Sequence, residues 1–333
     1  MGAPLISVIL PVFNGAPYLE EALRSILRQT EGDWELIAVD DGSTDDTPEI
    51  LKTLTEQDKR IRLIQRDHEG IVAALCLACS EAKGNLLARM DADDIAEPTR
   101  FAEQADLLRQ EPEVQLCSTR VQTIGSDSGT GWKRYERWIN ARCHHDDIVR
   151  ELFVECPLPH PGFMMRRLFY EKIGGYRDRG WPEDYDLVMR AWQGGARFAK
   201  PDPILLRWRE HPERLSKNDP RYTPKAFRQL KRHFLSHSYL KRRTVPFIQW
   251  GAGEVGKRWL REWPTPPQAV VDIHPRKVGR IIHGVRVIPR EALPAPGQAF
   301  VVIAVGARGA RSDIRHYLGR KGYEELRHYL FIA

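Results

Sequence analysis

The sequence has no long apolar segment and few cysteines. Its longest largely apolar runs, Leu5–Leu10 and Ala299–Val305, are far shorter than the ~18 residues that a membrane-spanning helix needs. Five cysteines, an odd number at irregular spacing, exclude a disulfide framework. The first four residues lack the basic and apolar regions of a signal peptide. We therefore expect a soluble protein of the cytoplasm.

The chain also lacks internal repeats, low-complexity segments and a strong charge of one sign. Fifty-one basic residues against 45 acidic ones give a net charge of +6. Such a mild excess suits anionic ligands without requiring nucleic acid, and we expect no nucleic-acid partner. With 42% hydrophobic and 29% charged residues, the composition is that of a globular protein. At ~150 residues per domain, 333 residues favour two domains.

Apolar strands alternate with amphipathic helices over the first 110 residues. Strands are predicted at 5–10, 36–39, 61–64 and 86–90, and helices of ordinary length lie between them. This alternation predicts an α/β fold with a parallel sheet. In such folds, ligands bind at the carboxyl ends of the strands.

The same alternation starts again near residue 244. A strand leads into Gly251-Ala-Gly-Glu-Val-Gly256 and a helix, and further strands end at Asp272 and Val305. The segment Lys225–Arg243, which has seven basic residues and no acidic one, precedes this second pattern. We therefore predict domains at residues 1–224 and 244–333, joined by a basic helical linker at 225–243.

Two acidic clusters come directly after predicted strands. Asp91-Ala-Asp93-Asp94 places three carboxylates within four residues, an all-oxygen set that suits Mg²⁺ or Mn²⁺. Asp40-Asp41-Gly42-Ser43 offers carboxylates to a base or ribose, and its glycine permits close backbone approach. Acidic turns and helix caps are the plainer interpretation of each cluster taken alone.

Taken together, several motifs resemble the family-2 glycosyltransferases of the GT-A fold. The matching segments are ISVILPVFNGAPYLEEALRSILRQT, WELIAVDDGSTDDT, GNLLARMDADDIAEPTRF, HPGFMMRR, GGYRD, PEDYDLVMR and WREHPERLS, in the order of the family. The resemblance covers roughly residues 4–216. It implies an inverting, metal-dependent enzyme that moves a sugar from a nucleotide-diphosphate donor, typically a UDP-sugar, to a hydroxyl of a glycan, lipid-linked or other acceptor.

The resemblance also implies roles for the matching residues on the donor side. Asp91 and Asp93 would bind the Mg²⁺ or Mn²⁺ ion, and His211 would lie near the metal and the diphosphate. One departure concerns Leu75, where many members carry an arginine that contacts the nucleotide; Arg66 or Arg89 could replace it. The residues implied to form the nucleotide site are Pro11, Phe13, Asn14, Asp40, Asp41, Ser43, Asp91 and Ala92.

On the acceptor side, the resemblance assigns the pair Glu183-Asp184 to catalysis, with Asp184 as the general base that deprotonates the acceptor hydroxyl. His160 and Trp181 would line the acceptor site. A first-turn helix charge is the structural alternative for Asp184, and a core position is the alternative for the tryptophan.

The predicted domain at 244–333 resembles small Rossmann-like domains that bind nucleotides or coenzymes. Its candidate ligand residues are Gly251, Gly253, Gly256 and Asp272, with the glycines approaching a diphosphate and the carboxylate a ribose hydroxyl. An empty docking or homodimerisation domain is the alternative role. A second function, an NAD-dependent sugar-nucleotide oxidoreductase or epimerase, would act through this domain, but no catalytic set comes after it in the sequence. Lys225–Arg243 could contact a membrane surface peripherally, or form a solvated helix between domains.

Overall fold

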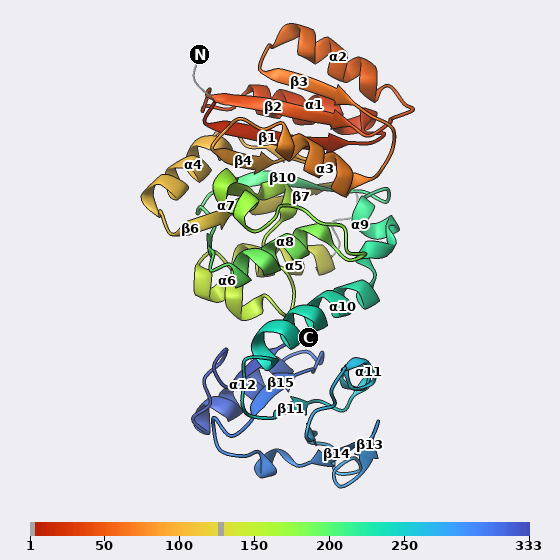
Figure 1. Ribbon diagram of the computed structural model, residues 1–333, viewed down its shortest axis with the longest axis vertical. Coiled ribbons are helices and arrows are strands. Elements are labelled where there is room, and N and C mark those ends of the chain that lie inside the picture. The colour runs from red at the N-terminus through yellow and green to blue at the C-terminus, as the bar shows by residue number, and fades with distance from the viewer. Residues whose placement is uncertain (1–3, 126–129) are drawn as a thin grey trace. The chain divides into compact units, whose positions relative to one another are not determined.

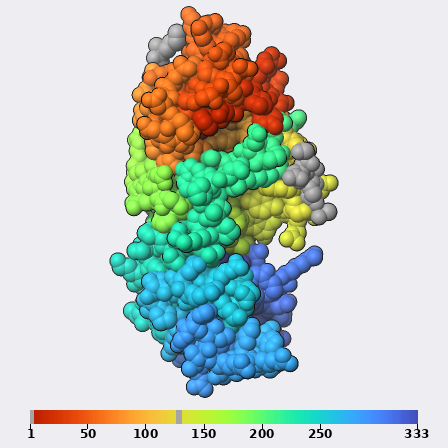
Figure 2. All heavy atoms as spheres, turned by 90° about the vertical axis from the view of Figure 1, so that its right-hand side faces the viewer, coloured from red at the N-terminus to blue at the C-terminus, as the bar shows by residue number. Residues whose placement is uncertain are grey.

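The computed structural model describes residues 4–125 and 130–333 (Figure 1, and the coloured atoms of Figure 2). The predicted absence of a signal peptide rests on residues 1–4, and residues 1–3 of this segment lie outside the described residues. The chain divides into two compact units. The first comprises Met1–Ile148 and Pro157–Tyr222, and the second comprises Val149–Cys156 and Thr223–Ala333. The predicted linker at 225–243 thus belongs to the second unit.

The first unit is built on a seven-stranded sheet with the order β3-β2-β1-β4-β8-β6-β9. All seven residues of its strand β1 are buried, as a parallel strand covered on both faces requires. The four parallel strands confirm those predicted from the sequence. They are β1 (Ile6–Val12), β2 (Trp34–Asp40), β3 (Ile61–Gln65) and β4 (Leu86–Arg89).

Helices cover both faces of these parallel strands. Alternate β1 residues, among them Val8 and Leu10, belong to a core that also contains buried side chains of α1, α2 and α4. Helix α3 packs on β1 and β2, against the residues of opposite alternation such as Ile9. The sheet is therefore fixed from both sides, and its carboxyl-end loops project from a rigid base. The helices are α1 (Ala16–Leu27), α2 (Thr47–Gln57), α3 (Ile71–Ser80) and α4 (Arg100–Gln110).

The later part of the first unit adds antiparallel pairing. Strand β8 (Met164–Arg166) pairs antiparallel with β4 and with β6 (Val114–Cys117), and β9 (Arg197–Ala199) lies beside β6. A small second sheet has the order β5-β10-β7, in which Leu206 of β10 lies opposite Ala96 of β5. This pairing brings the end of β10 to the acidic loop before β5. The remaining elements are β5 (Ile95–Ala96), β7 (Arg120–Gly125), β10 (Ile204–Glu210), α5 (Thr130–Asn140), α6 (His145–Glu151), α7 (Arg167–Lys172), α8 (Glu183–Gln193), α9 (Leu215–Asn218) and the 3₁₀ turns His160–Gly162 and Pro220–Tyr222.

The second unit contains a six-stranded sheet with the order β13-β14-β12-β11-β15-β16. Its strands pair in parallel except for the antiparallel edge pair β13 and β14. No helix in the described part of the chain is long and apolar enough to cross a membrane. The elements are β11 (Phe247–Trp250), β12 (Val270–Val271), β13 (Ile281–Ile282), β14 (Val285–Ile288), β15 (Phe300–Ile303), β16 (Tyr329–Phe331), α10 (Pro224–Phe234), the π-helix Leu235–Leu240, α11 (Glu254–Glu262), the 3₁₀ turn Arg290–Ala292 and α12 (Ala310–Arg320).

The basic segment 225–243 is partly neutralised within the second unit. Arg228 and Arg232 both pair with Glu262, at 2.9 and 3.3 Å. Lys231 is buried, and the Arg243 guanidinium lies over an aromatic ring of the unit's core. Most of the predicted surface charge is therefore used in internal contacts. The exposed basic side chains of the segment are those of Lys225, Lys241 and Arg242.

Candidate active site

The acidic clusters both lie at the carboxyl ends of parallel strands, as predicted. Asp40 ends β2 and Asp91 comes shortly after β4, while β1 lies between these two strands in the sheet. The chain runs outward from β1 to β2 and β3 on one side and continues at β4 on the other. This change of direction creates the crevice at which open α/β sheets bind ligands.

The first acidic loop is tied to the loops beside it. The Asp41 carboxylate accepts hydrogen bonds from the backbone N–H groups of Glu69, at 3.1 Å, and Gly70, at 2.8 Å. Asp40 accepts one from the backbone N–H of Ser43, at 3.0 Å. Both aspartates are 2% exposed. Asp41 therefore fixes the start of helix α3, a structural role that the motif alone did not reveal, and its contact with a nucleotide stays a prediction.

The loop after β1 carries Phe13 and Asn14, which were predicted to form the wall of the nucleotide site. Phe13, 46% exposed, stacks on the ring of His68 with the centroids 4.1 Å apart. Asn14 adopts a positive φ of 50°, and its side-chain oxygen accepts the Thr44 N–H at 2.8 Å, while its own N–H donates to Ser43 Oγ at 2.9 Å. The structure thus brings these predicted residues together, beside the buried Pro11. No pattern in the sequence pointed to His68.

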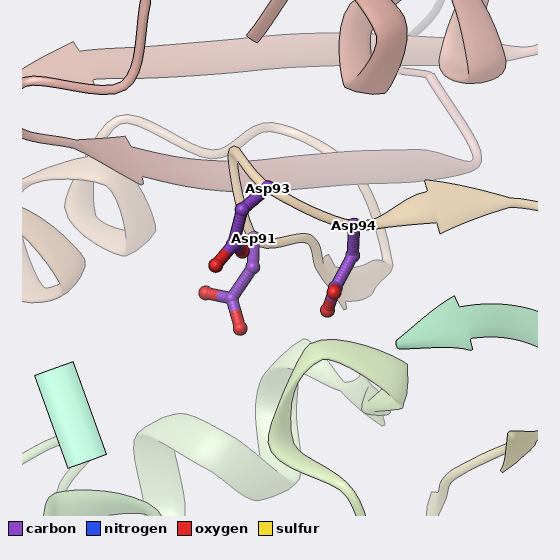
Figure 3. Close-up of side chains that lie close together, drawn as sticks. All are labelled: Asp91, Asp93 and Asp94. Atoms are coloured by element: carbon purple, nitrogen blue, oxygen red, sulfur yellow. The ribbon is translucent and has the colours of Figure 1, made fainter. Parts of the chain in front are cut away.

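The second acidic loop gathers three carboxylates. One oxygen each from Asp91, Asp93 and Asp94 lies within 4.8 Å of the others. Figure 3 shows the carboxylates of Asp91 and Asp93 side by side, with that of Asp94 directed to the same side of the loop. The half-buried Ala92 separates the first two. Convergent oxygens of this kind match the coordination preference of Mg²⁺ and Mn²⁺.

Strand β10 completes this cluster from a distant part of the sequence. His211 comes directly after β10, and its Nε2 lies 2.8 Å from Asp93 Oδ2. The backbone N–H of Arg209 donates to Asp94 Oδ1 at 2.7 Å, and the Arg209 side chain donates to the Asp93 carbonyl at 2.8 Å. The predicted proximity of His211 to the acidic cluster is therefore present in the structure.

Arg89, Arg209 and Arg214 lie near the acidic cluster, yet one of its carboxylate oxygens has no partner in the described residues. Burial, together with the nearby Asp91 charge, raises the pKa of Asp93. Burial also raises the pKa of Asp94 well above its usual range. Within the described residues, Asp94 Oδ2 is buried without a hydrogen-bond partner. A buried polar atom without a partner costs free energy, so the cluster fits a bound divalent cation.

Arg89 lies directly beneath the acidic loop. Its Nη2 pairs with Asp91 Oδ1, whereas its buried Nε and Nη1 have no partner in the part of the chain that the structure describes. Arg66, the other candidate to replace an arginine at Leu75, pairs with Asp41 at 3.3 Å. Leu75 itself is fully buried. The two candidate arginines therefore contact opposite acidic loops, Arg66 on the nucleotide side and Arg89 on the metal side.

Helix α8 begins with Glu183 and Asp184, which have different surroundings. Glu183 is fully buried, accepts hydrogen bonds from the Tyr222 hydroxyl at 2.9 and 2.8 Å, and has a pKa raised by burial. Asp184 is half-buried, and its Oδ1 accepts the Tyr185 N–H at 2.7 Å. Exposure therefore favours Asp184 over Glu183 as the carboxylate that an acceptor can reach.

The comparison with protein families covers the two acidic loops and ends before α8. The model described as Glycosyl transferase family 2 matches residues 7–174. The chain belongs to glycosyltransferase family 2. Among relatives of this glycosyltransferase, the putative glycosyltransferase EpsE of Bacillus subtilis is 32% identical over 212 residues, which cover 62% of this chain and 73% of EpsE. The O-antigen biosynthesis glycosyltransferase WbnJ of Escherichia coli is 29% identical over 246 residues, covering 72% of this chain and 91% of WbnJ.

Solved structures show the same fold for this glycosyltransferase. Staphylococcus aureus TarS 1–349 in complex with UDP-GlcNAc has a TM-score of 0.57 at 17% identity, covering 71% of this chain and 66% of TarS 1–349. The mannosyltransferase PcManGT of Pyrobaculum calidifontis, in complex with GDP-Man and Mn²⁺, has a TM-score of 0.50 at 21% identity, covering 72% and 64%. The match therefore spans just under two thirds of the TarS 1–349 fragment and of PcManGT. The α/β fold is that of the GT-A glycosyltransferases.

Two predicted acceptor residues of the glycosyltransferase lie near the start of α8. His160 Nε2 lies 2.7 Å from the Tyr176 hydroxyl, and its Nδ1 lies 3.7 Å from Glu183. Burial, with the nearby Arg89 charge, lowers the pKa of His160 well below its usual range, so its imidazole is neutral. The half-buried Trp181 donates its indole N–H to Asp186 at 2.9 Å. The structure thus places His160 beneath the Glu183 carboxylate and ties the Trp181 ring to α8.

The candidate residues of the second unit lie together around one loop of this glycosyltransferase. Gly251 and Gly253 connect β11 to α11, Gly256 lies in the first turn of α11, and Asp272 comes directly after β12. The Asp272 carboxylate accepts the Ala252 N–H at 2.9 Å and is thus directed at the glycine loop.

Proposed function

We propose that the protein is a metal-dependent, inverting glycosyltransferase that uses a UDP-sugar as donor. The observation that carries this proposal is the cluster of Asp91, Asp93 and Asp94 at the carboxyl end of β4, inside a family-2 GT-A fold. The acceptor is a hydroxyl of a glycan or of a lipid-linked saccharide. The similarity to an O-antigen biosynthesis enzyme and to TarS with bound UDP-GlcNAc supports a role in polysaccharide assembly and the choice of donor.

In this proposal, Asp91 and Asp93 hold a Mg²⁺ or Mn²⁺ ion, with His211 beside them. A bound divalent cation stabilises the negative charge that develops on the leaving diphosphate. The protein groups prepare this position, because Arg89 holds Asp91 and His211 contacts Asp93. Mn²⁺ in the similar mannosyltransferase supports the choice of ion.

The nucleotide lies between the two acidic loops, against the carboxyl end of β1. Phe13, stacked on His68, presents an apolar surface to the base. Asp40 and Asp41 offer carboxylate oxygens to its N–H group, because each oxygen can accept more than one hydrogen bond. Pro11, Asn14, Ser43 and Ala92 complete the walls of this part of the site.

Asp184 is the proposed general base. It removes the proton of the acceptor hydroxyl as that oxygen attacks the anomeric carbon from the side opposite the diphosphate, which inverts the configuration. Glu183 does not reach the acceptor. Its contacts with Tyr222 and His160 orient the first turn of α8. Trp181 contributes an aromatic face near the acceptor.

Donor hydrolysis and transfer by the full chain test this function. We expect release of UDP from one UDP-sugar of a panel when Mn²⁺ or Mg²⁺ is present, and none after chelation by EDTA. With an acceptor glycan, proton NMR of the product should show the inverted anomeric configuration. Turnover that persists in EDTA, or retention of configuration, would contradict the proposed mechanism.

Other roles predicted from the sequence receive less support. The NAD-dependent oxidoreductase is not proposed, since the matched family and the relatives described above are glycosyltransferases. Peripheral membrane contact, at the cytoplasmic face, would use Lys225, Lys241 and Arg242, the exposed basic side chains of the 225–243 segment. A Rossmann-like second unit and a homodimer formed through it stay predictions.

A further inference from the structure

The second unit contains a cavity of about 470 Å³. This volume is within the ~300–1,000 Å³ of typical small-molecule sites. All of its lining residues lie between Trp250 and Tyr317. The cavity is at the carboxyl ends of β11 and β15, two neighbouring parallel strands from which the sheet extends to β12 on one side and to β16 on the other. Such a switch point is where open α/β sheets bind ligands.

Glycine is present at positions 251, 253 and 256 of the cavity for different structural reasons. At Gly251, which has a φ of +114°, a Cβ would lie 2.5 Å from the Ala304 carbonyl oxygen. At Gly256 a Cβ would lie 2.0 Å from the carbonyl oxygen of Gly251. Backbone packing therefore explains these two. Gly253 has an ordinary φ of −80°, and a Cβ there would meet nothing within 4 Å. Its missing side chain instead leaves the first turn of α11 open to a ligand in the cavity.

The groups around Gly253 suit a phosphate. Helix α11 begins after this residue, and among the described residues no side chain caps its start. The free N–H groups of a first helical turn, with the helix dipole, attract phosphate groups. Lys277 and Arg290 also line the cavity, paired with Asp272 at 3.0 Å and with Glu291 at 2.8 Å, and Asp313 lines it as well. Glu254 lines it as well, but its side chain is 79% exposed and pairs with Lys257 at 3.3 Å.

Asp272 has a structural role in addition to the ribose contact predicted for it, which stays a prediction. Its Oδ2 accepts hydrogen bonds from the Ala252 N–H, at 2.9 Å, and from Lys277 Nζ, at 3.0 Å. Its Oδ1 accepts the His274 N–H at 2.8 Å. The carboxylate therefore holds the glycine loop and Lys277 in place. The next residue, Ile273, lines the cavity although 70% exposed, and so offers an apolar surface to a base.

The connection between β12 and β14 differs from that of a dinucleotide site. Dinucleotides bind across two βαβαβ halves. In the described residues of the second unit, no helix joins β12 to β14, so the half that begins β11-α11-β12 lacks its second crossover helix. One glycine loop, one uncapped helix start at Gly253 and one exposed apolar residue correspond to a single nucleotide.

We propose that this cavity binds one nucleoside diphosphate, either free or as part of a nucleotide-sugar. The diphosphate lies on the backbone of residues 251–256 beside Lys277, and the base lies against Ile273. This inference goes beyond the proposed transfer reaction and does not depend on it, because the cavity shares no residue with the acidic cluster.

Isothermal titration calorimetry of the full chain in EDTA tests the proposal. Chelation removes divalent cations and with them donor binding at the acidic cluster, so the second site is measured alone. The probes are UDP, GDP, ADP, a UDP-sugar, NAD and inorganic diphosphate. We expect one nucleoside diphosphate to bind one-to-one. Comparing UDP with the UDP-sugar shows whether the free nucleotide or the nucleotide-sugar is the natural ligand.

Two substitutions of cavity residues test whether the nucleoside diphosphate binds in the cavity. Gly253→Val adds a side chain at a position where a Cβ meets nothing within 4 Å, and it should weaken binding ~10-fold or more, about 1.4 kcal/mol. Ile273→Glu changes an exposed residue and should have a similar effect. The control Gly319→Val alters an exposed glycine of α12 that also has nothing within 4 Å, and should bind as the unaltered protein does.

Three results would overturn the proposal: no binding of any nucleoside diphosphate in EDTA, unchanged binding in both Gly253→Val and Ile273→Glu, or tighter binding of NAD than of every nucleoside diphosphate. Circular dichroism of each variant confirms folding. Metal-dependent turnover is measured in the same preparations, so failure of the transfer function is recognised separately.

Discussion

The two units share one strand order and differ in the loops at the carboxyl ends of those strands. In the first unit four parallel strands have the order β3-β2-β1-β4, and in the second unit β14-β12-β11-β15 have the same order, with β16 pairing in parallel beyond β15. The first unit places carboxylates after β2 and β4, whereas the second places a glycine loop after β11. The shared order locates a ligand crevice in each unit, and the side chains decide what each crevice can do.

The two crevices also differ in whether their charged side chains find hydrogen-bond partners within the protein. Around the first crevice, Asp94 Oδ2 and two Arg89 nitrogens are buried without partners within the described residues. At the second crevice, the Asp272 carboxylate accepts three hydrogen bonds from the protein itself. An unpartnered carboxylate oxygen is suited to a cation and unpartnered guanidinium N–H groups to an anion, while a hydrogen-bonded carboxylate is suited to shaping a binding loop.

The largest difference should appear on removal of one carboxylate. Asp93→Ala should lower UDP-sugar turnover by ~10³-fold or more, because one remaining neighbouring carboxylate cannot hold both the cation and the diphosphate. Turnover is measured by UDP release. Asp106→Ala removes an exposed carboxylate of α4 and serves as the control. Gly253→Val in the second unit should leave turnover within ~3-fold, and an equal loss in that variant would break the distinction between the units.

The next largest effect on the transfer rate is expected for Asp184, the proposed general base. Asp184→Asn should lower kcat by ~10²–10⁴-fold while leaving donor affinity nearly unchanged, because the amide cannot take the acceptor proton. Pre-steady-state transfer and calorimetric UDP binding measure the two quantities. Asp178→Asn, an exposed change shortly before α8, is the control. If donor affinity falls as much as the rate, Asp184 supports the fold instead of catalysis.

A smaller effect is expected at the histidine beside the cluster. His211→Ala should raise the Mn²⁺ concentration for half-maximal turnover by ~10–100-fold, and saturating Mn²⁺ should restore most of the rate. Titration of activity with Mn²⁺ measures this shift. His144→Ala, at an exposed position, should leave it unchanged. If this Mn²⁺ concentration is unchanged in both variants, His211 does not belong to the metal site.

The smallest effect tests the buried charge of the second unit. Burial lowers the pKa of Lys231 to about 8, below its unfolded value of 10.5. The unfolded chain therefore binds more protons between these values, and this residue's contribution to the free energy of unfolding rises with pH. From pH 7 to pH 9 the unaltered protein should gain about 1 kcal/mol relative to Lys231→Met. Urea unfolding at both pH values measures the difference, and a constant difference would contradict the shifted pKa.

The parallel strands and the acidic loops could be predicted well from the sequence, because both depend on local patterns. Largely apolar runs such as 5–10 and 86–90, the second interrupted by Arg89, are typical of buried parallel strands, and Asp91 and Asp93 come shortly after the second run. The motif resemblance also placed His211 near the cluster, although 118 residues separate it from Asp93.

Contacts made by tertiary packing could not be predicted in this way. The stack of His68 on Phe13 and the burial of Glu183 under Tyr222 depend on where loops meet. Residues 149–156 join the second unit for the same reason. The glycine pattern did predict a loop at residue 251. Only the geometry shows that a Cβ at Gly253 would meet nothing within 4 Å, and that Asp272 accepts a hydrogen bond from the Ala252 N–H.

The most direct measurement is diffraction at the manganese absorption edge from crystals of the full chain grown with Mn²⁺ and UDP. We predict an anomalous peak bound by the Asp91 and Asp93 carboxylates and by the diphosphate, with the uracil beside Phe13. A manganese ion bound elsewhere, or a diphosphate in this crevice that is held without the metal, would contradict the assignment of the acidic cluster as the transfer centre.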